Sequence, residues 1–273
     1  MRRVLAPNAS PFTYTGTQTY LVGGEEGLAV IDPGPAEAEH LAALEEAIHG
    51  AAVLAILCTH THRDHSPAAG PLAERTGAPV VGCAPLVVEN ADDFPRADAP
   101  FDRDYAPDRV LADGEQVSGP GWTLTALATP GHTSNHLCFA LEESGAVFTG
   151  DHVMGWSTSV VAPPDGDMAD YLASLEKLYA RGDRIYYPAH GPAVERPRQL
   201  VRGMIGHRRQ RERQILKLLE QEAGAVEALV PQMYRGIDER LWPAAAQSVR
   251  AHLIDLERRG LVARSGDIWT IAA

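Results

Sequence analysis

The chain has 273 residues, of which 45% are hydrophobic and 22% are charged, as in an ordinary soluble globular protein. This length allows one large domain, or one large and one small domain. No window approaches the roughly 18 uninterrupted apolar residues that span a bilayer. The apolar run after Met1 is too short for a signal peptide, so we expect a cytoplasmic protein that does not enter a membrane.

The net charge of −12 is unevenly distributed along the chain. Residues 1–191 carry 10 Lys+Arg and 26 Asp+Glu, which gives −16, whereas residues 192–273 carry 14 and 10, which gives +4. A body at −16 repels a polyanion such as a nucleic acid, although the basic C-terminal part could offset this locally. The three cysteines are few and scattered in apolar surroundings, which predicts buried free thiols and no disulfide framework.

Strands and helices alternate over the first 190 residues, which is typical of an α/β fold. The predicted elements are a hairpin over 20–31, helix 37–49, strand 51–58, helix 66–75, strand 80–81, strand 122–129, strand 146–149, helix 170–181 and strand 184–187. Asp170 is a possible N-cap of its helix. His40, His49 and His252 are predicted on helix surfaces. Residues 90–108, rich in Asp, Pro and Arg, predict a surface loop or a flap.

The character of the chain changes after Gly191. Helices are predicted over 200–222, 225–234 and 244–259, followed by a hairpin over 261–271, which is the outline of a winged helix. We therefore place a domain boundary between residues 195 and 196. The helix before the hairpin carries Arg250, Arg258 and Arg259 together with acidic and apolar residues, a mixture that favours packing over DNA recognition. A winged-helix DNA-binding regulator remains the alternative of a different class.

His60-Thr61-His62-Arg63-Asp64-His65 is the most informative segment, because it offers three imidazoles and one carboxylate directly after a buried strand. Imidazole nitrogen with one carboxylate oxygen suits zinc better than calcium or magnesium. In an extended segment, residues two apart point the same way, so His60 and His62 can reach one metal ion. Asp64 and His65 lie past the turn and can face a second ion.

Three further strand ends deliver His or Asp into loops flanked by Gly and Pro, where catalytic groups are often placed. These loops are Pro130-Gly131-His132, Gly150-Asp151 and Pro188-Ala189-His190-Gly191. Together, THTHRDH at 59–65, TPGHT at 129–133, FTGD at 148–151 and PAHG at 188–191 resemble the motifs of the metallo-β-lactamase superfamily. Segments at 10–23 and 207–216 are similar to those of the β-lactamase-like protein 2 subfamily and its bacterial relatives, so the resemblance covers nearly the whole chain.

The resemblance implies an αββα metallo-β-lactamase sandwich over residues 1–195, followed by a helical, winged-helix-like domain over 196–273. It implies two zinc ions per chain, one held by His60, His62 and His132, the other by Asp64, His65 and His190, with Asp151 between them. Zinc lowers the pKa of bound water to about 7, so a metal-bound hydroxide would be the nucleophile of a hydrolase. Asp64 would orient that nucleophile as the catalytic residue.

Two other histidines are candidates for supporting roles. His136 is expected to support its loop or to approach the substrate, and His207 could line the rim of the site. The subfamily resemblance implies cleavage of single-stranded RNA, which the acidic body disfavours. Hydrolysis of a small-molecule ester or thioester, as in relatives of the glyoxalase II type, is the alternative. The sequence leaves both substrates and the oligomeric state open.

Overall fold

A computed structural model of the chain describes residues 1–86, 101–236 and 238–272. Residues 90–100 of the predicted flap lie outside the described residues. Within the described ranges, no helix is both long enough and apolar enough to cross a membrane.

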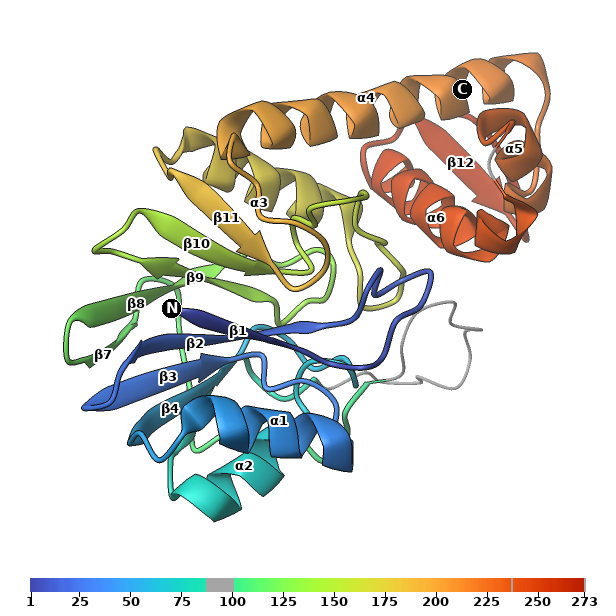
Figure 1. Ribbon diagram of the computed structural model, residues 1–273. Coiled ribbons are helices and arrows are strands. Elements are labelled where there is room, and N and C mark those ends of the chain that lie inside the picture. The colour runs from blue at the N-terminus through green and yellow to red at the C-terminus, as the bar shows by residue number, and fades with distance from the viewer. Residues whose placement is uncertain (87–100, 237, 273) are drawn as a thin grey trace.

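Two β-sheets packed face to face, with helices on both outer surfaces, form the body of the molecule (Figure 1). The arrangement confirms the αββα sandwich. The strands of the first sheet, in spatial order, are β1 (Arg2–Leu5), β2 (Gln18–Gly24), β3 (Gly27–Ile31), β4 (Val53–Cys58), β5 (Val80–Gly82) and β6 (Arg109–Val110). Strands β3 to β6 pair in parallel, and β1 and β2 are antiparallel to their neighbours.

The second sheet contains five strands, and only its edge strand β11 pairs in parallel. Its spatial order is β11 (Ile185–Pro188), β10 (Ala146–Gly150), β9 (Leu137–Leu141), β8 (Trp122–Ala128) and β7 (Gln116–Gly119). Strands β1, β6, β7 and β9 had not been predicted. Three of these lie at or next to a sheet edge, where exposed residues interrupt the apolar pattern, and β9 follows the histidine loop without a break.

Helices α1 (Ala38–Ile48) and α2 (Ala69–Thr76) lie on the outer face of the first sheet, and α3 (Met168–Ala180) and α4 (Pro197–Gln221) lie on that of the second (Figure 1). Helix α2 begins three residues later than predicted. Tertiary hydrogen bonds hold the preceding turn, because Ser66 donates to Asp102 and the backbone N–H of Ala68 donates to Gly34. Asp167, not Asp170, caps α3, since its carboxylate accepts from the N–H groups of Ala169 and Asp170.

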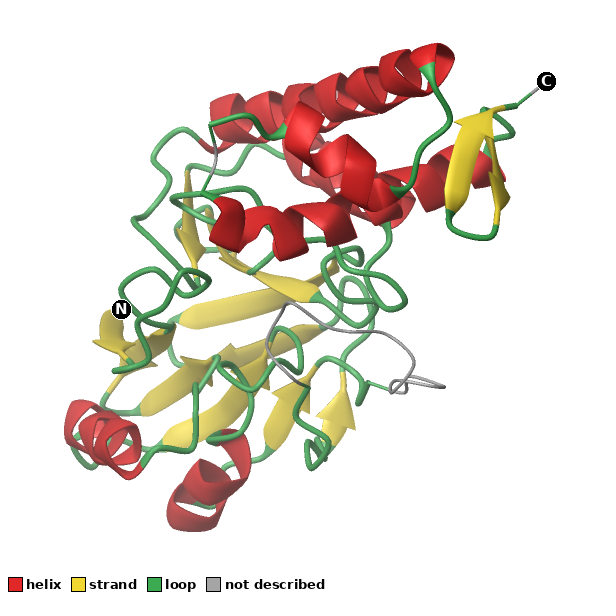
Figure 2. Ribbon diagram, turned by 90° about the vertical axis from the view of Figure 1, so that its right-hand side faces the viewer, coloured by secondary structure: helices red, strands yellow, loops and turns green. Residues whose placement is uncertain are grey.

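The C-terminal part contains α5 (Val226–Met233), a 3-10 turn (Glu239–Leu241), α6 (Trp242–Arg258) and the hairpin β12 (Val262–Ser265) with β13 (Ile268–Ile271). Figure 2 shows the hairpin at one end of this helical part, as in a winged helix. Trp269 of the hairpin is buried in a core that also contains Ile215 and Leu219 of α4. The domain boundary between residues 195 and 196 stays a prediction, but α4 itself contributes to two cores.

The first half of α4 packs on the sandwich. Val201 and Met204 join a core that includes Tyr171 of α3 and Tyr186 of β11. Helix α4 is therefore continuous between the sandwich and the winged helix, and it fixes the second relative to the first.

Two histidines predicted on helix surfaces are buried. His40 packs against the turn that follows β3, where its Nε2 lies 2.9 Å from the carbonyl oxygen of Pro33. His252 of α6 faces α4, and neither of its ring nitrogens has a hydrogen-bond partner among the described residues. Helical periodicity alone did not reveal these two positions because each is covered by a segment distant in sequence. His49 is exposed, as predicted.

Gly131 allows the loop that carries His132 to approach helix α3. Its φ is +131°, and a Cβ at this position would lie 2.3 Å from backbone atoms of Tyr171. We expect Gly131→Ala to lower the free energy of unfolding by roughly 3 kcal/mol, because strain at positive φ adds to a backbone clash. Gly121→Ala is the control, since Gly121 has φ +73° but open space around it, and should cost about 1 kcal/mol. Equal losses in urea unfolding would contradict the contact with α3.

Burial lowers the pKa of His252 to about 3, and the nearby arginines act in the same direction. The folded protein therefore keeps this ring neutral, whereas the unfolded chain takes up a proton below about pH 6.5, so stability is lost as the pH falls. We expect the free energy of unfolding of His252→Leu, compared with that of the natural chain, to improve by about 2 kcal/mol when the pH is lowered from 7.5 to 5. His49→Gln, which replaces an exposed histidine, is the control. Denaturant unfolding at both pH values measures the difference.

Candidate metal centre

Four loops that follow strands β4, β8, β10 and β11 meet at one edge of the sandwich. They carry all seven residues that the sequence predicts as metal ligands. The structure gathers the potential ligand atoms into two groups, in each of which all atoms lie within 4.8 Å of one another. The first group contains His60, His62, His132 and Asp151, and the second contains Asp64, His65 and His190.

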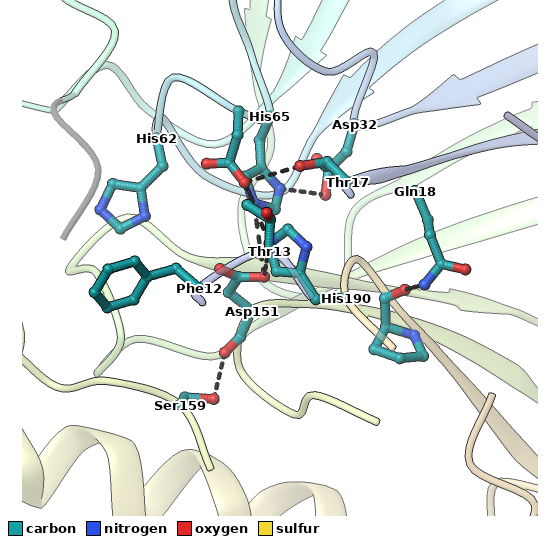
Figure 3. Close-up of polar contacts among 12 residues, drawn as sticks. Phe12, Thr13, Thr17, Gln18, Asp32, His62, His65, Asp151, Ser159 and His190 are labelled. Atoms are coloured by element: carbon teal, nitrogen blue, oxygen red, sulfur yellow. Dashed lines mark hydrogen bonds and ion pairs between the residues drawn. The ribbon is translucent and has the colours of Figure 1, made fainter. Parts of the chain in front are cut away.

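Asp151 lies between the two groups, and Figure 3 shows its carboxylate beside His65 and His190. Its Oδ1 is 3.2 Å from Nε2 of His190 and 3.6 Å from Nε2 of His65, while its Oδ2 is 3.7 Å from Nε2 of His132. One carboxylate oxygen thus faces each group. This is the arrangement that a ligand shared by two metal ions requires.

The hydrogen bonds behind the first group show which ring nitrogens carry lone pairs. Nδ1 of His132 lies 2.7 Å from the carbonyl oxygen of Val160, which only accepts, so the proton is on Nδ1 and Nε2 is bare. The hydroxyl of Thr59 donates to Asp32, so it accepts from Nδ1 of His60 and leaves Nε2 of His60 bare as well. Both lone pairs converge on His62.

The first group fits a metal ion of imidazole preference. Nδ1 of His62 is 2.9 Å from Nε2 of His60 and 3.1 Å from Nε2 of His132, close to the roughly 3.3 Å between nitrogens of a tetrahedral zinc site. Burial, together with neighbouring imidazoles, lowers the pKa of His62 to about 3 and that of His60 well below its usual value. Neutral imidazole is the form that binds metals.

The second group is rich in negative charge. Burial alone would raise the pKa of Asp64, but His65 and His190 hold it well below its usual value. The carboxylates of Asp151 and Asp64 raise the pKa of His190 to about 9, although burial alone would lower it. Two buried carboxylates therefore require positive charge at this point. A divalent cation can supply that charge in place of the protons, so these residues fit a second metal ion.

Asp32 is a residue of this site that the sequence analysis missed. It directly follows β3 with φ +47°, and its carboxylate accepts from the backbone N–H of Thr59 at 2.7 Å and the hydroxyl of Thr59 at 2.8 Å. It also accepts from Nδ1 of His65 at 3.1 Å, which leaves Nε2 of that ring directed toward Asp64 and Asp151 (Figure 3). Such partners fix the tautomer and the orientation of ligand imidazoles. The only signal in the sequence was an acidic residue directly after a strand, before Pro33.

His136 supports the loop of Asp151. Its Nε2 accepts from the backbone N–H of Asp151 at 3.2 Å, and its Nδ1 donates to the hydroxyl of Thr129 at 3.0 Å. Both nitrogens are therefore occupied by the protein, and His136 positions Asp151 from behind. Thr17, also missed from the sequence, donates to Oδ2 of Asp64 at 2.9 Å from the opposite side of the site.

A pocket of about 350 Å³ opens on both groups and extends to the winged-helix part. It is lined by metal-centre residues His62, Asp64, His132, Asp151 and His190 at one end, and by His207, Arg208 and Arg211 of α4 together with residues of α6. His207 thus lies where the sequence placed it, on the rim. Phe12, Trp156 and Leu241 line the pocket as exposed apolar side chains. Phe101, the first described residue of the predicted flap, contacts the ring of His62.

The arginines of helix α6 pair with carboxylates of the protein itself. Arg258 pairs with Asp167, Arg259 pairs with Glu212, and Arg250 lies 3.8 Å from Glu227. These contacts tie the helix to the rest of the protein and favour the packing role over DNA recognition.

Comparisons with known proteins agree with this geometry. A model of the metallo-beta-lactamase superfamily matches residues 13–190, and a model of the beta-lactamase associated winged helix domain matches residues 225–269. A beta-lactamase-like protein 2 homolog of Drosophila melanogaster is 33% identical over 97% of this chain and 91% of that protein. An atrochrysone carboxyl ACP thioesterase of Aspergillus fumigatus is 34% identical over 80% of this chain and 64% of that protein.

The identity of the metal is open between zinc and iron. A solved protein in a di-iron-bound form is 31% identical to this chain, covers 71% of it and 94% of its own length, and superposes with a TM-score of 0.55. Histidine and carboxylate ligands suit either metal. The two His/Asp groups indicate a dinuclear centre, and the sequence-based choice of zinc stays a prediction.

We expect Asp32→Asn to weaken metal binding by about 10- to 100-fold, because an amide has only one accepting oxygen and cannot receive all three hydrogen bonds that Asp32 accepts from Thr59 and His65. Metal content after dialysis against a graded chelator series measures the change. Asp183→Asn is the control, since Asp183 is also nearly buried and accepts hydrogen bonds, but from Arg181 outside the centre. Equal retention of metal by both variants would show that Asp32 does not position the ligands.

Proposed function

Because the chain belongs to the metallo-β-lactamase superfamily and is a metal-dependent hydrolase, we propose that it hydrolyses acyl thioesters. The observation that carries the proposal is the pocket, which joins the metal centre to apolar walls. Phe12, Trp156, Met154, Val160 and Leu241 line it, and such side chains bind an acyl chain and exclude water. A thioesterase among the relatives supports the same substrate class.

Two metal ions, when bound by the seven residues, would supply Lewis acidity and a nucleophile derived from water at neutral pH. The protein's own residues prepare the reaction. Oδ2 of Asp64 is held by the hydroxyl of Thr17 and faces His65 and His190, whereas its Oδ1 makes no hydrogen bond within the described part of the chain. Asp64 also lines the pocket, so Oδ1 is placed to accept a proton from the attacking water. We assign Asp64 this catalytic role.

Asp151 and the imidazoles hold their positions during such a reaction because hydrogen bonds fix them from behind. Ser159 donates to the backbone carbonyl groups of Asp151 and His152, and His136 accepts from the N–H of Asp151. The backbone of Asp151 is thereby held on both sides. A rigid, preorganised set of ligands lowers the reorganisation needed at each turnover.

Single-stranded RNA, the substrate expected from the subfamily resemblance, fits the described surface less well. The body of the chain carries a net charge of −16, and the arginines of α6 are paired with the protein's own carboxylates. Binding of an RNA backbone depends on free cationic side chains. RNA therefore enters the test below as the competing outcome.

The deciding assay compares labelled single-stranded RNA with acyl thioesters on protein of measured metal content. We expect thioester hydrolysis that a chelator abolishes and that Asp64→Asn, compared with the natural chain at matched metal content, lowers at least about 100-fold in kcat/KM. Asp113→Asn, which alters an exposed carboxylate paired with Lys177, is the control and should leave the rate unchanged. Turnover of RNA without turnover of thioesters would overturn the proposal.

A further inference from the structure

Two arginines of α4, Arg208 and Arg211, line the same pocket as the metal centre. They belong to the winged-helix side of the molecule, whereas the ligands belong to the sandwich. Neither arginine has a carboxylate within 4.0 Å among the described residues. Their charges therefore lie beside the pocket without a protein counter-ion.

Arg208 is 2% exposed. Its Nη2 donates to the carbonyl oxygen of Ser159, its guanidinium lies 5.0 Å from the ring centroid of Tyr171, and its buried Nε has no hydrogen-bond partner in the described ranges. Burying a charge with an unsatisfied donor is costly unless an anion compensates it. Arg208 is thus set up for a negative group that the protein itself does not provide.

The neighbours of Arg208 do not neutralise it. Burial lowers the pKa of His252 to about 3 and that of His207 to about 4, and nearby arginines push in the same direction, so these two rings are neutral at pH 7. Asp255, which lies close to His252 in the sequence of α6, is a buried carboxylate, but it accepts from Arg259 at 2.9 Å.

Arg211 is also surrounded by neutral groups. Its Nε lies 3.3 Å from Nε2 of His207, and its Nη1 donates to Gln214 at 2.9 Å and to the carbonyl oxygen of Met233 at 2.8 Å. Its guanidinium lies 4.2 Å from the ring centroid of Tyr234. Arg209 of the same helix and Arg258 and Arg259 of α6 each form an ion pair with a carboxylate of the protein.

We propose that Arg208 and Arg211 form an anion subsite that selects thioesters bearing a negative group, either a carboxylate on the acyl chain or a phosphate on the thiol arm. The inference rests on the proposed thioesterase function and names the substrate class within it. In this arrangement the thioester carbon of the substrate lies at the metal centre. The apolar walls of the pocket bind the part of the substrate between the thioester and its anion, and the anion reaches the arginines of α4. Guanidinium groups are suited to carboxylate and phosphate alike.

The test measures binding without turnover, by calorimetry on the metal-loaded protein with three thioethers that cannot be hydrolysed. These are S-hexyl-N-acetylcysteamine, which is neutral, S-(5-carboxypentyl)-N-acetylcysteamine, which has a carboxylate on the acyl side, and S-hexyl-pantetheine 4′-phosphate, which has a phosphate on the thiol side. We expect at least one anionic thioether to bind about 10-fold or more tightly than the neutral one, and the preferred compound identifies the source of the anion.

Arg208→Gln and Arg211→Gln should each reduce that preference several-fold while leaving the affinity for the neutral thioether unchanged. Arg208→Lys keeps the charge and should retain part of the preference, which also covers the case in which Arg208→Gln does not fold. Arg209→Gln is the matched control, because it removes one charge from the adjacent position, where Arg209 pairs with Glu176 outside the pocket, and it should retain the full preference.

Equal binding of neutral and anionic thioethers by the natural chain would overturn the subsite. So would an equal loss for both in the Arg208 and Arg211 variants, which would mean that the arginines only anchor α4 to the loop of Ser159. A preserved anion preference without any thioester hydrolysis would instead refute the proposed function and leave the subsite in place.

Discussion

The carboxylate of Asp32 connects the end of strand β3 to the loop that follows β4, and both halves of the metal centre depend on this connection. It accepts directly from His65, a member of the second group. Through the hydroxyl of Thr59 it also determines the tautomer of His60, a member of the first group. A single buried carboxylate, held at positive φ, thus directs one imidazole lone pair toward each metal position.

The two groups are electrostatically different although they share Asp151. In the first group, burial keeps His60 and His62 neutral, whereas in the second the carboxylate of Asp64, together with that of the shared Asp151, raises the pKa of His190. A cation that binds at the second position displaces protons from imidazole rings, whereas a cation at the first position binds imidazole nitrogens that carry no proton. Metal loading is therefore coupled to proton release mainly at the second position.

The metal ligands could be found from the sequence because each follows a strand within a few residues, so that local order already determines where the side chain emerges. The sandwich and the winged helix were likewise accessible, through apolar periodicity and motif order. Asp32, Thr17 and Arg208 were not, since their roles arise from contacts with segments distant along the chain. The burial of His40 and His252 escaped prediction for the same reason, as helical periodicity carries no information about which neighbouring segment covers a face.

Helix α4 has one half in the core of the sandwich and the other half in the core of the winged helix. The metal ligands come from loops of the first 190 residues, which also supply the near walls of the pocket, whereas its far wall comes from α4 and α6. The pocket is therefore built from two different stretches of the chain, which α4 joins. Substitutions in the last third of the chain can therefore change the shape and charge of the pocket while the metal ligands stay the same.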